Sequence, residues 1–470
     1  MDLFGDPKMR DEINPFVELL WKKGSAYEKD VINGVGDPFL DLSMYAGDEK
    51  EQLTTEAMKD GERLIYGGRI QEGNLLGDPD LLRKGLGGYV AGDIKSGAGI
   101  EGNDDLSKPK KHYAVQIALY TDILERKGMS AGRTPFIWDV YGEEVTYDLD
   151  ELQGQKTSVS LWETYEDALG TAERIASNTE TSKPAYGGIC KMCHWYSACQ
   201  KQLENLDDLT MLPELGRSKR DEMVDDIATV SDLAIINVDH FTRGKKTIFK
   251  GIGVGSLEKF HKRAKLAKTK GATPYLTSPV SLPYVETELF FDIETDPMRD
   301  LCYLHGFIER HNGDNSTEKY VAFFSDDTSE AEEERAFADA WGYIQSHQPC
   351  VVYYYSKYER TIWRKLREKY PNVCTEAELE DLFDPKKSVD LYFDVVKRHT
   401  EWPTKDYSIK TLATYLGFMW RDTHPSGAAS IQWFDEWIAW GDHKVKQRIL
   451  DYNEDDCVAT RVLLDGVRAL

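Results

Sequence analysis

The stretch LFFDIET, Leu289–Thr295, is an apolar run that ends in two carboxylates. It predicts a buried strand, and alternation along a strand places Asp292 and Glu294 on the same face. Burying carboxylates costs free energy unless a positive charge lies between them. A divalent metal is the usual such charge, and phosphodiester hydrolysis is the usual reason for it. The stretch therefore predicts a metal-binding strand, and a capped strand end is the alternative.

Apolar and helix-like segments continue on both sides of this stretch. Antiparallel strands followed by strand–helix alternation predict an α/β layer architecture for residues 283–470, with Pro279 and Pro283 at the join. We expect strands at 288–293, 302–309, 319–324 and 350–355, and helices at 330–346, 359–370, 391–399 and 410–416.

A second acidic group lies far downstream in YNEDD, Tyr452–Asp456. Tyr452 and Asp456 are four residues apart, so on a helix they share a face. LFFDIET and YNEDD resemble the first and third motifs of the DEDD exonucleases, and the resemblance spans nearly all of residues 286–467. It implies an RNase H-like DEDDy 3′–5′ exonuclease domain, with Asp292, Glu294 and Asp456 binding Mg²⁺ or Mn²⁺ and Tyr452 orienting the attacking water. An ordinary amphipathic helix residue is the alternative for Tyr452.

The second motif of that family is normally Asn-x-x-Phe/Tyr-Asp. The nearest match here is YSKYE, residues 355–359, with Tyr355 in place of Asn and Glu359 in place of Asp. The resemblance therefore implies Glu359 as a catalytic metal ligand that reaches the ion directly or through water. Asp390 is a weaker candidate for the same role.

The N-terminal part carries a second set of polar residues in order: Asp80 after GDP, then Asp93 and Lys95 in DIK, then Gln116 and Tyr120 in QIALY. Asp93 and Lys95 point to the same side of a strand. This is the PD-(D/E)XK arrangement, in which Asp80 and Asp93 hold Mg²⁺ and Lys95 positions water or stabilises charge on the phosphate. A surface ion pair is the alternative for Asp93 and Lys95. For Gln116 and Tyr120, on one helix face, a catalytic role and an interior polar pair remain equally open.

The run from Asp2 to Gln200 resembles the RecB-like nucleases, the family that includes the CRISPR-associated RecB-type exonucleases. The resemblance implies a restriction-endonuclease-like nuclease domain over residues 1–203. The family carries Gly-x-x-His-Glu near its start, whereas this chain has GSAYE at residues 24–28. Tyr27 thus stands where a metal-binding His is expected, and Glu28 is a candidate substitute.

Three cysteines, Cys190, Cys193 and Cys199, have the spacing C-x₂-C-x₅-C. The same resemblance implies that they ligate a [4Fe–4S] cluster. The family's fourth ligand lies near its N-terminus, but no Cys precedes Cys190 in this sequence. Three readings remain: a start further upstream, another group completing the site, or loss of the cluster. His194, next to Cys193, keeps Zn²⁺ open as a further alternative.

Residues 204–282 read as helices punctuated by Gly. LPELGRSK at 212–219 and FKGIGVG at 249–255 each precede a helix and resemble helix–hairpin–helix turns, in which backbone N–H groups at a helix N-terminus face a phosphate. Between Thr242 and Ala272 there are ten Lys and Arg against one acid, Glu258. An ordinary helical linker with a solvated surface is the alternative. The residues predicted to contact nucleic acid are Arg217, Lys219, Lys250, Gly251, Gly253, Lys259, Lys262 and Arg263.

The composition sets limits on the class of protein. A chain of 470 residues predicts two to four domains, and the absence of a long uncharged apolar run or an apolar leader predicts no membrane span and no secretory signal. Seven cysteines with one cluster indicate a reducing cytoplasm rather than a disulfide framework. The net charge of −24 opposes nucleic-acid binding, but segregation of charge makes net charge a weak guide.

The order RecB-like nuclease, helix–hairpin–helix segment and RNase H-like exonuclease resembles a family of bacterial and archaeal nucleases, some of which continue into a superfamily 1 helicase. We therefore expect a metal-dependent DNase that acts on single strands or ends with low sequence specificity, in DNA repair or defence, with any helicase acting in trans. One alternative is a DNA-binding scaffold with decayed nuclease sites. Another is an RNA-processing 3′ exonuclease.

Overall fold

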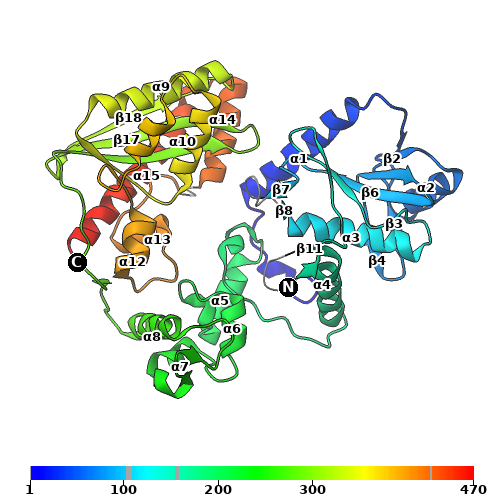
Figure 1. Cartoon of the computed structure of the whole chain (residues 1–470), viewed down its shortest axis with the longest axis horizontal. Coiled ribbons are helices and arrows are strands. Elements are labelled where there is room, and N and C mark those ends of the chain that lie inside the picture. The colour runs from blue at the N-terminus through cyan, green and yellow to red at the C-terminus, as the bar shows by residue number, and fades with distance from the viewer. Residues whose placement is uncertain (1, 102–107, 154–157, 424–425) are drawn as a thin grey trace. The chain divides into compact units, whose positions relative to one another are not determined.

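The computed structural model describes residues 2–101, 108–153, 158–423 and 426–470 (Figure 1). Contacts divide the chain into two compact units, one formed by Glu18–Lys183 and the other by Met1–Val17 together with Pro184–Leu470. These divisions differ from the predicted boundaries after residues 203 and 282, since the cysteine segment groups with the C-terminal part. The division into three domains stays a prediction.

The unit Glu18–Lys183 is built on a six-stranded mixed sheet in the order β1-β2-β5-β6-β9-β10. Helix α3 buries Ile117 and Ala118 in the main core of this unit, and α4 starts at a capping box between Ser160 and Glu163. The elements are α1 (Pro15–Asn33), β1 (Leu40–Asp41), α2 (Gly47–Asp60), β2 (Leu64–Tyr66), β3 (Ile70–Glu72), β4 (Leu75–Gly77), β5 (Leu81–Gly85), β6 (Gly88–Ile94), β7 (Ile100–Glu101), β8 (Lys108–Pro109), α3 (Lys111–Arg126), β9 (Phe136–Trp138), β10 (Glu144–Thr146), β11 (Leu152–Gln153), β12 (Val159–Ser160) and α4 (Leu161–Ala176).

The C-terminal part is built on a five-stranded sheet in the order β18-β17-β16-β19-β20, in which β16 pairs antiparallel with β17 and parallel with β19. Alternate residues of β16 enter different cores. Leu289 and Phe291 pack with α9, α10 and α11, whereas Phe290 packs with α13 and α15. The structure thus confirms the expected layers. The elements are β16 (Thr287–Asp296), β17 (Leu301–His311), β18 (Asp314–Phe324), α9 (Glu330–Ser346), β19 (Cys350–Tyr354), α10 (Tyr358–Lys369), α11 (Glu376–Leu382), β20 (Ser388–Asp390), the π-helix η6 (Leu391–Val396), α12 (Lys397–His399), β21 (Thr400–Glu401), α13 (Ile409–Tyr415), α14 (Gly427–Trp440) and α15 (His443–Arg468).

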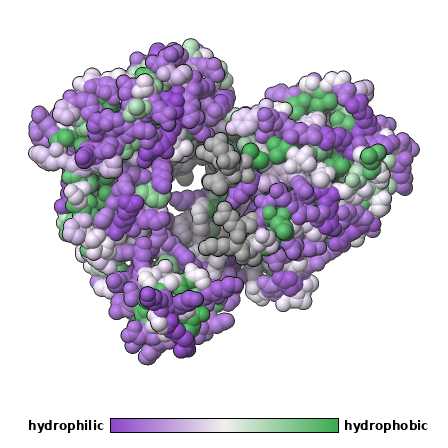
Figure 2. Space-filling view, viewed as in Figure 1, coloured by the Kyte–Doolittle hydropathy of each residue, from purple (hydrophilic) through white to green (hydrophobic). Residues whose placement is uncertain are grey.

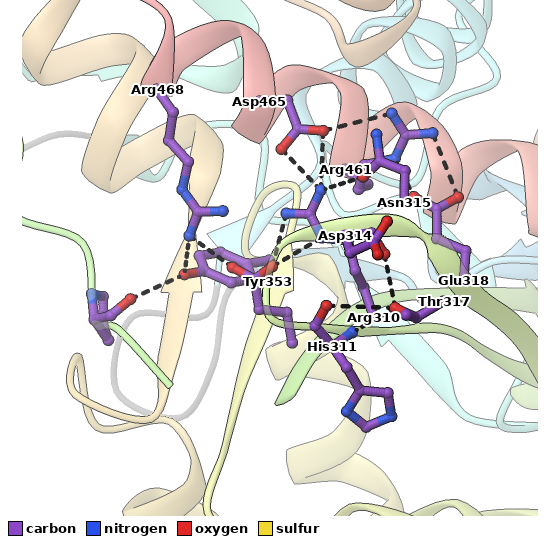
Figure 3. A network of polar contacts seen from close by, with 12 residues as sticks. Arg310, His311, Asp314, Asn315, Thr317, Glu318, Tyr353, Arg461, Asp465 and Arg468 are labelled. Atoms are coloured by element: carbon purple, nitrogen blue, oxygen red, sulfur yellow. Dashed lines mark hydrogen bonds and ion pairs between the residues drawn. The ribbon is translucent and has the colours of Figure 1, made fainter. Parts of the chain in front are cut away.

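Buried ion pairs fix the last helix against this sheet. Arg310 on β17, 1% exposed, donates to Asp465 of α15 at 2.9 Å and to Glu288 of β16 at 2.8 Å (Figure 3). Arg468 donates to the other oxygen of Glu288 at 2.6 Å. Because α15 carries Tyr452 and Asp456, these contacts also set the position of the predicted third motif relative to β16.

A smaller helical core precedes the sheet. As predicted, both glycine-containing turns lead into helices, with Gly216 as the N-cap of α6 and Gly253 as the N-cap of α8. Leu257 and Phe260 of α8 are buried in this core together with Leu215. The elements are η3 (Gly188–Met192), α5 (Tyr196–Leu206), η4 (Leu209–Met211), α6 (Arg217–Met223), α7 (Val230–Ile235), η5 (Val238–Phe241), β13 (Thr242–Arg243), β14 (Lys246–Thr247), α8 (Val254–Lys268) and β15 (Tyr275–Leu276), which pairs with β21.

The face shown in Figure 2 is mostly hydrophilic, and hydrophobic residues form small separate patches on it. Among the described residues, none of the helices combines the length and the apolar character needed to cross a membrane.

Candidate metal centre and active site

Three carboxylates meet where β16 faces α15. Asp292 and Glu294 come from β16 and Asp456 from α15, and each offers an oxygen atom within 4.8 Å of the others. In the described part of the chain, this is the one group of three or more His, Cys, Asp and Glu side chains with ligand atoms this close. Glu294 and Asp456 are 4% and 9% exposed. The predicted convergence of these three residues is therefore present.

Burial and mutual repulsion dominate the electrostatics of this cluster. Desolvation raises the pKa of Asp292 well above its usual value, and the charges of Asp456, Glu294 and Glu359 raise it further. The pKa of Glu294 is raised well above its usual value for the same reasons, burial first and then Asp456. Carboxylates that resist ionisation together are held as anions by a cation placed between them.

A hydrogen bond between strand and helix orients Asp292. Asn453, one residue after Tyr452, donates from Nδ2 to Oδ2 of Asp292 at 2.8 Å, and its Oδ1 accepts from the Tyr320 hydroxyl at 2.9 Å. Gly306 on β17 makes room for this amide, because a Cβ there would lie 1.6 Å from Asn453 Oδ1. Asn453 was not predicted from the sequence, and the available signal of this close approach was an isolated Gly inside an apolar strand.

Asp456 has three polar neighbours. Trp420 donates from Nε1 to Oδ1 of Asp456 at 2.7 Å, and the Tyr452 hydroxyl also hydrogen-bonds to this carboxylate. Lys410 of α13 lies 3.4 Å from the Tyr452 hydroxyl. Burial lowers the pKa of Lys410, and the charges of Asp456, Glu294 and Asp292 oppose that change. Trp420 and the role of Lys410 were not foreseen from the sequence.

Glu359 occupies the first turn of α10 beside this cluster. It is 4% exposed, and its Oε2 is buried without a hydrogen-bond partner among the described residues. Burial raises the pKa of Glu359 well above its usual value, and the charges of Asp390 and Asp456 raise it further. Asp390 itself accepts backbone N–H groups from Ser356, Tyr392 and Phe393, each at 3.0 Å, so its role is to cap η6. Glu359 is thus the better placed of the two candidates.

The structure also brings Asp80, Asp93 and Lys95 together. Asp80 Oδ2 accepts from the backbone N–H of Ile94 at 2.8 Å, and the Lys95 ammonium lies 2.5 Å from Asp93 Oδ2. Asp93 is 1% exposed. Burial, and then the Asp93 charge, raise the pKa of Asp80 well above its usual value. This buried arrangement differs from a surface ion pair.

Residues around Asp80 clarify the remaining N-terminal predictions. Gln116 donates to the Tyr120 hydroxyl at 2.8 Å, and the charges of Asp93 and Asp80 raise the pKa of Tyr120, after the larger effect of burial. Both readings of the Gln116–Tyr120 pair are therefore compatible with the structure. Glu28 accepts from the Tyr66 hydroxyl at 2.9 Å, and its charge adds to the raised pKa of Asp80. Tyr27 instead donates to the Asp139 carbonyl at 2.5 Å.

The three clustered cysteines are partly exposed and carry free thiols. Burial, followed by the charges of Cys193 and Cys190, raises the pKa of the Cys199 thiol, but the three sulfurs do not all lie within 4.8 Å of one another. His194 Nε2 forms a hydrogen bond with Asp2 Oδ1 at 3.0 Å. Binding of a [4Fe–4S] cluster and binding of Zn²⁺ by these cysteines both stay predictions.

Most of the residues predicted to contact nucleic acid are exposed at the surface. Arg217, Lys250, Gly251, Gly253 and Lys262 are exposed, whereas Lys219 and Lys259 are partly buried.

The predicted contact between Arg263 and nucleic acid is wrong. The side chain of Arg263 is 1% exposed, and it pairs with Glu401 at 2.7 Å and with Glu214 at 3.0 Å. Helical spacing places Arg263 on the apolar face of α8 beside Phe260, so it links the helical core to β21 and is inaccessible to nucleic acid. Lys259 also pairs with Glu214 at 3.0 Å.

Comparison with known proteins supports one part of this assignment. A sequence model of the RNase H superfamily matches residues 289–467, from LFFDIET through YNEDD. Comparisons with the curated proteins and with the solved structures gave no match. The C-terminal domain is therefore RNase H-like, a class that is consistent with a nuclease. The match begins at residue 289 and does not include the N-terminal unit or the helical core. The family resemblances of those two parts stay predictions.

Proposed function

We propose that the protein is a metal-dependent nuclease that hydrolyses DNA phosphodiester bonds, as an exonuclease on single strands or ends. The convergence of Asp292, Glu294 and Asp456 within 4.8 Å carries this proposal. Three carboxylates at this separation, two buried and one half-buried, repel one another, and their all-oxygen donor set is the one that Mg²⁺ and Mn²⁺ prefer. The unpartnered Oε2 of Glu359 supplies a further donor beside them.

Each residue then has a defined task. Asp292, Glu294 and Asp456 would hold the metal, and Glu359 would hold a second ion directly or through water. The bound ions would polarise the phosphate and lower the pKa of water. Tyr452, hydrogen-bonded to Asp456, orients the attacking water through its hydroxyl. Lys410, 3.4 Å from Tyr452, brings positive charge to the scissile phosphate.

The N-terminal unit is the basis of a second proposed site. Asp80 and Asp93 would bind Mg²⁺ or Mn²⁺, with Lys95 beside the phosphate. The buried contact between Lys95 and Asp93 and the raised pKa of Asp80 support this reading. A [4Fe–4S] cluster on Cys190, Cys193 and Cys199 would order the segment that carries them.

We test the proposal with purified protein, Mn²⁺ and end-labelled single-stranded DNA, duplex DNA and RNA. Shortening of single-stranded DNA that Asp292→Asn abolishes supports the C-terminal site. Loss in Asp93→Asn but not in Asp292→Asn moves the chemistry to the N-terminal unit. Faster digestion of RNA contradicts the DNA assignment. Salt-sensitive binding without cleavage contradicts the nuclease and indicates a scaffold.

A further inference from the structure

A pocket of about 370 Å³ lies between the segment that carries the cysteines and residues 392–407 of the RNase H-like domain. It is lined by Tyr186, Tyr392 and Lys405, and on one side by Gly187 and Gly188. Its volume falls within the range of roughly 300–1,000 Å³ in which small ligands bind. Residues 212–216, from the first predicted helix–hairpin–helix turn, form a further wall, and the predicted metal sites do not account for the pocket.

The walls of this pocket are fixed by hydrogen bonds. The Tyr186 hydroxyl donates to Asp406 at 2.8 Å, and the Tyr186 backbone N–H donates to Thr210 at 2.9 Å. Tyr392 packs against Tyr355, with ring centroids 5.5 Å apart. Two tyrosine side chains are therefore held in place on different segments of the chain, as an aromatic platform requires.

The pocket offers an anion one cation, Lys405. Its two carboxylates have partners, because Asp406 accepts from Tyr186 and Ser408 while Glu214 pairs with Lys259, Arg263 and Lys397. Lys405 contacts only neutral groups, the Tyr196 hydroxyl at 3.3 Å and the amide oxygen of Gln200 at 3.2 Å. Among the residues that the structure describes, no carboxylate forms an ion pair with Lys405.

Two segments connect this pocket to the metal centre. Tyr355, against Tyr392, is followed by Lys357, whose ammonium lies 4.6 Å from the Phe393 ring, and then by Glu359. On the other wall, Lys191 follows Gly188 by three residues, and its charge acts on Lys410. Cations therefore accompany the route from the pocket to the carboxylates.

We propose that this pocket binds one nucleotide of a single-stranded polynucleotide, with its base against Tyr186 and Tyr392 and its phosphate at Lys405, while another phosphodiester of the same strand lies at the metal centre. Aromatic rings beside basic side chains are the features by which proteins hold single strands without reading sequence. A paired base is already stacked in its duplex and cannot enter. The inference rests on the proposed function and specifies its substrate.

Filling the pocket tests this. Gly187 has φ −165°, an extended conformation that any residue adopts, and a Cβ there would meet nothing within 4 Å. Gly187→Leu therefore occupies the pocket without backbone strain. Gly342→Leu is the matched control, because Gly342 is exposed on α9 and its Cβ also meets nothing within 4 Å. Lys405→Gln removes the charge alone and serves if Gly187→Leu fails to fold.

Binding is measured by fluorescence anisotropy with labelled oligothymidylate and oligouridylate of about a dozen nucleotides, with Ca²⁺ in place of Mn²⁺. We expect Gly187→Leu and Lys405→Gln to bind about tenfold more weakly than wild type and Gly342→Leu. Binding of a blunt hairpin should change little. Hydrolysis of the p-nitrophenyl ester of thymidine 5′-phosphate, which occupies only the metal centre, should be unchanged in Gly187→Leu.

The outcomes separate the two proposals. Equal oligonucleotide affinity of Gly187→Leu, Lys405→Gln and wild type overturns the pocket assignment, as does failure of the wild type to bind either oligonucleotide. Cleavage by wild type that is lost in Asp292→Asn would still support the nuclease. Conversely, pocket-dependent binding without any hydrolysis sustains the pocket and contradicts the nuclease.

Discussion

Asn453 on α15 and Asp292 on β16 are joined by a hydrogen bond of 2.8 Å, through which the helix sets the orientation of a carboxylate in the proposed metal centre. The same amide accepts from Tyr320 on β18, so three elements of the domain converge on one side chain. Asn453 touches a proposed metal ligand, not the metal itself. Its role is therefore positioning, and its contribution depends on the space left by Gly306.

Gly306→Ala should disturb this contact. The added Cβ would lie 1.6 Å from Asn453 Oδ1, so the amide or the helix must move. Overpacking of this kind costs about 1–3 kcal/mol of the free energy of unfolding, which urea denaturation measures. We also expect a lower kcat with Mn²⁺. Gly342→Ala, on the exposed face of α9, is the control, and wild-type stability and kcat in Gly306→Ala would disprove the role of this contact.

Neutral replacements in the carboxylate cluster should have opposite effects on metal binding and on the stability of the metal-free protein. Asp292→Asn, Glu294→Gln and Asp456→Asn each remove a ligand, so Mn²⁺ affinity measured by calorimetry should fall at least about tenfold. Each also removes a buried like charge, so the melting temperature in EDTA should rise. Glu454→Gln, on the same helix but paired with Arg421, is the control. Unchanged Mn²⁺ binding in all three variants would refute the metal centre.

The cluster also predicts a dependence on pH. Burial raises the folded-state pKa values of Asp292, Glu294 and Asp456, and the charge of Asp456 raises those of Asp292 and Glu294 further. A carboxyl group with a raised folded-state pKa contributes stability below its unfolded pKa of about 4, and this contribution is lost as pH rises through the folded-state value. The metal-free protein should thus lose stability as pH rises above about 4, through the folded-state pKa values. Melting curves in EDTA and in Mn²⁺ test this, and Mn²⁺ should stabilise more at higher pH. A metal-independent profile would contradict the assignment.

The sequence was sufficient to predict the structure where the residue types and the apolar periodicity indicated the same element. LFFDIET predicted a buried strand with Asp292 and Glu294 on one face, and that face meets Asp456 of α15 as expected. The match to the RNase H superfamily covers the same region. Carboxylates at the end of an apolar strand are costly to bury, so their presence reports on function directly.

Other residues depended on contacts between distant segments. Asn453 and Trp420 act by donating to Asp292 and Asp456, and nothing in their local sequence distinguishes them from ordinary helix and loop residues. Arg263 was misassigned because charge was counted along the chain rather than around the helix. Its acidic partner Glu401 lies 138 residues away in the sequence, so the residues around Arg263 could not predict the buried pair.

Substitutions of Arg263 and Lys262 should therefore differ in their effects: the first should lower the free energy of unfolding, and the second should weaken DNA binding. Arg263→Ala leaves Glu401 buried without its partner, which costs about 3–5 kcal/mol of the free energy of unfolding. Lys262→Ala, one residue away and exposed, should leave urea denaturation unchanged. If the predicted phosphate contact exists, Lys262→Ala weakens DNA binding equally for all sequences and reduces its salt dependence. A stable Arg263→Ala that binds DNA poorly would reverse this correction.

The contact between Lys95 and Asp93 distinguishes a metal site from a structural ion pair in the N-terminal unit. In Lys95→Met the Asp93 carboxylate, 1% exposed, loses its cation, so the free energy of unfolding in EDTA should fall by about 3–5 kcal/mol. Mn²⁺ bound by Asp80 and Asp93 would replace the missing charge, so it should raise the melting temperature of Lys95→Met more than that of wild type. Lys108→Met, which breaks an exposed pair with Glu101, is the control; it should cost under about 1 kcal/mol, and Mn²⁺ should raise its melting temperature as much as that of wild type. If Mn²⁺ stabilises Lys95→Met no more than wild type, Asp93 and Lys95 are a buried structural pair, and hydrolysis belongs to the C-terminal centre alone.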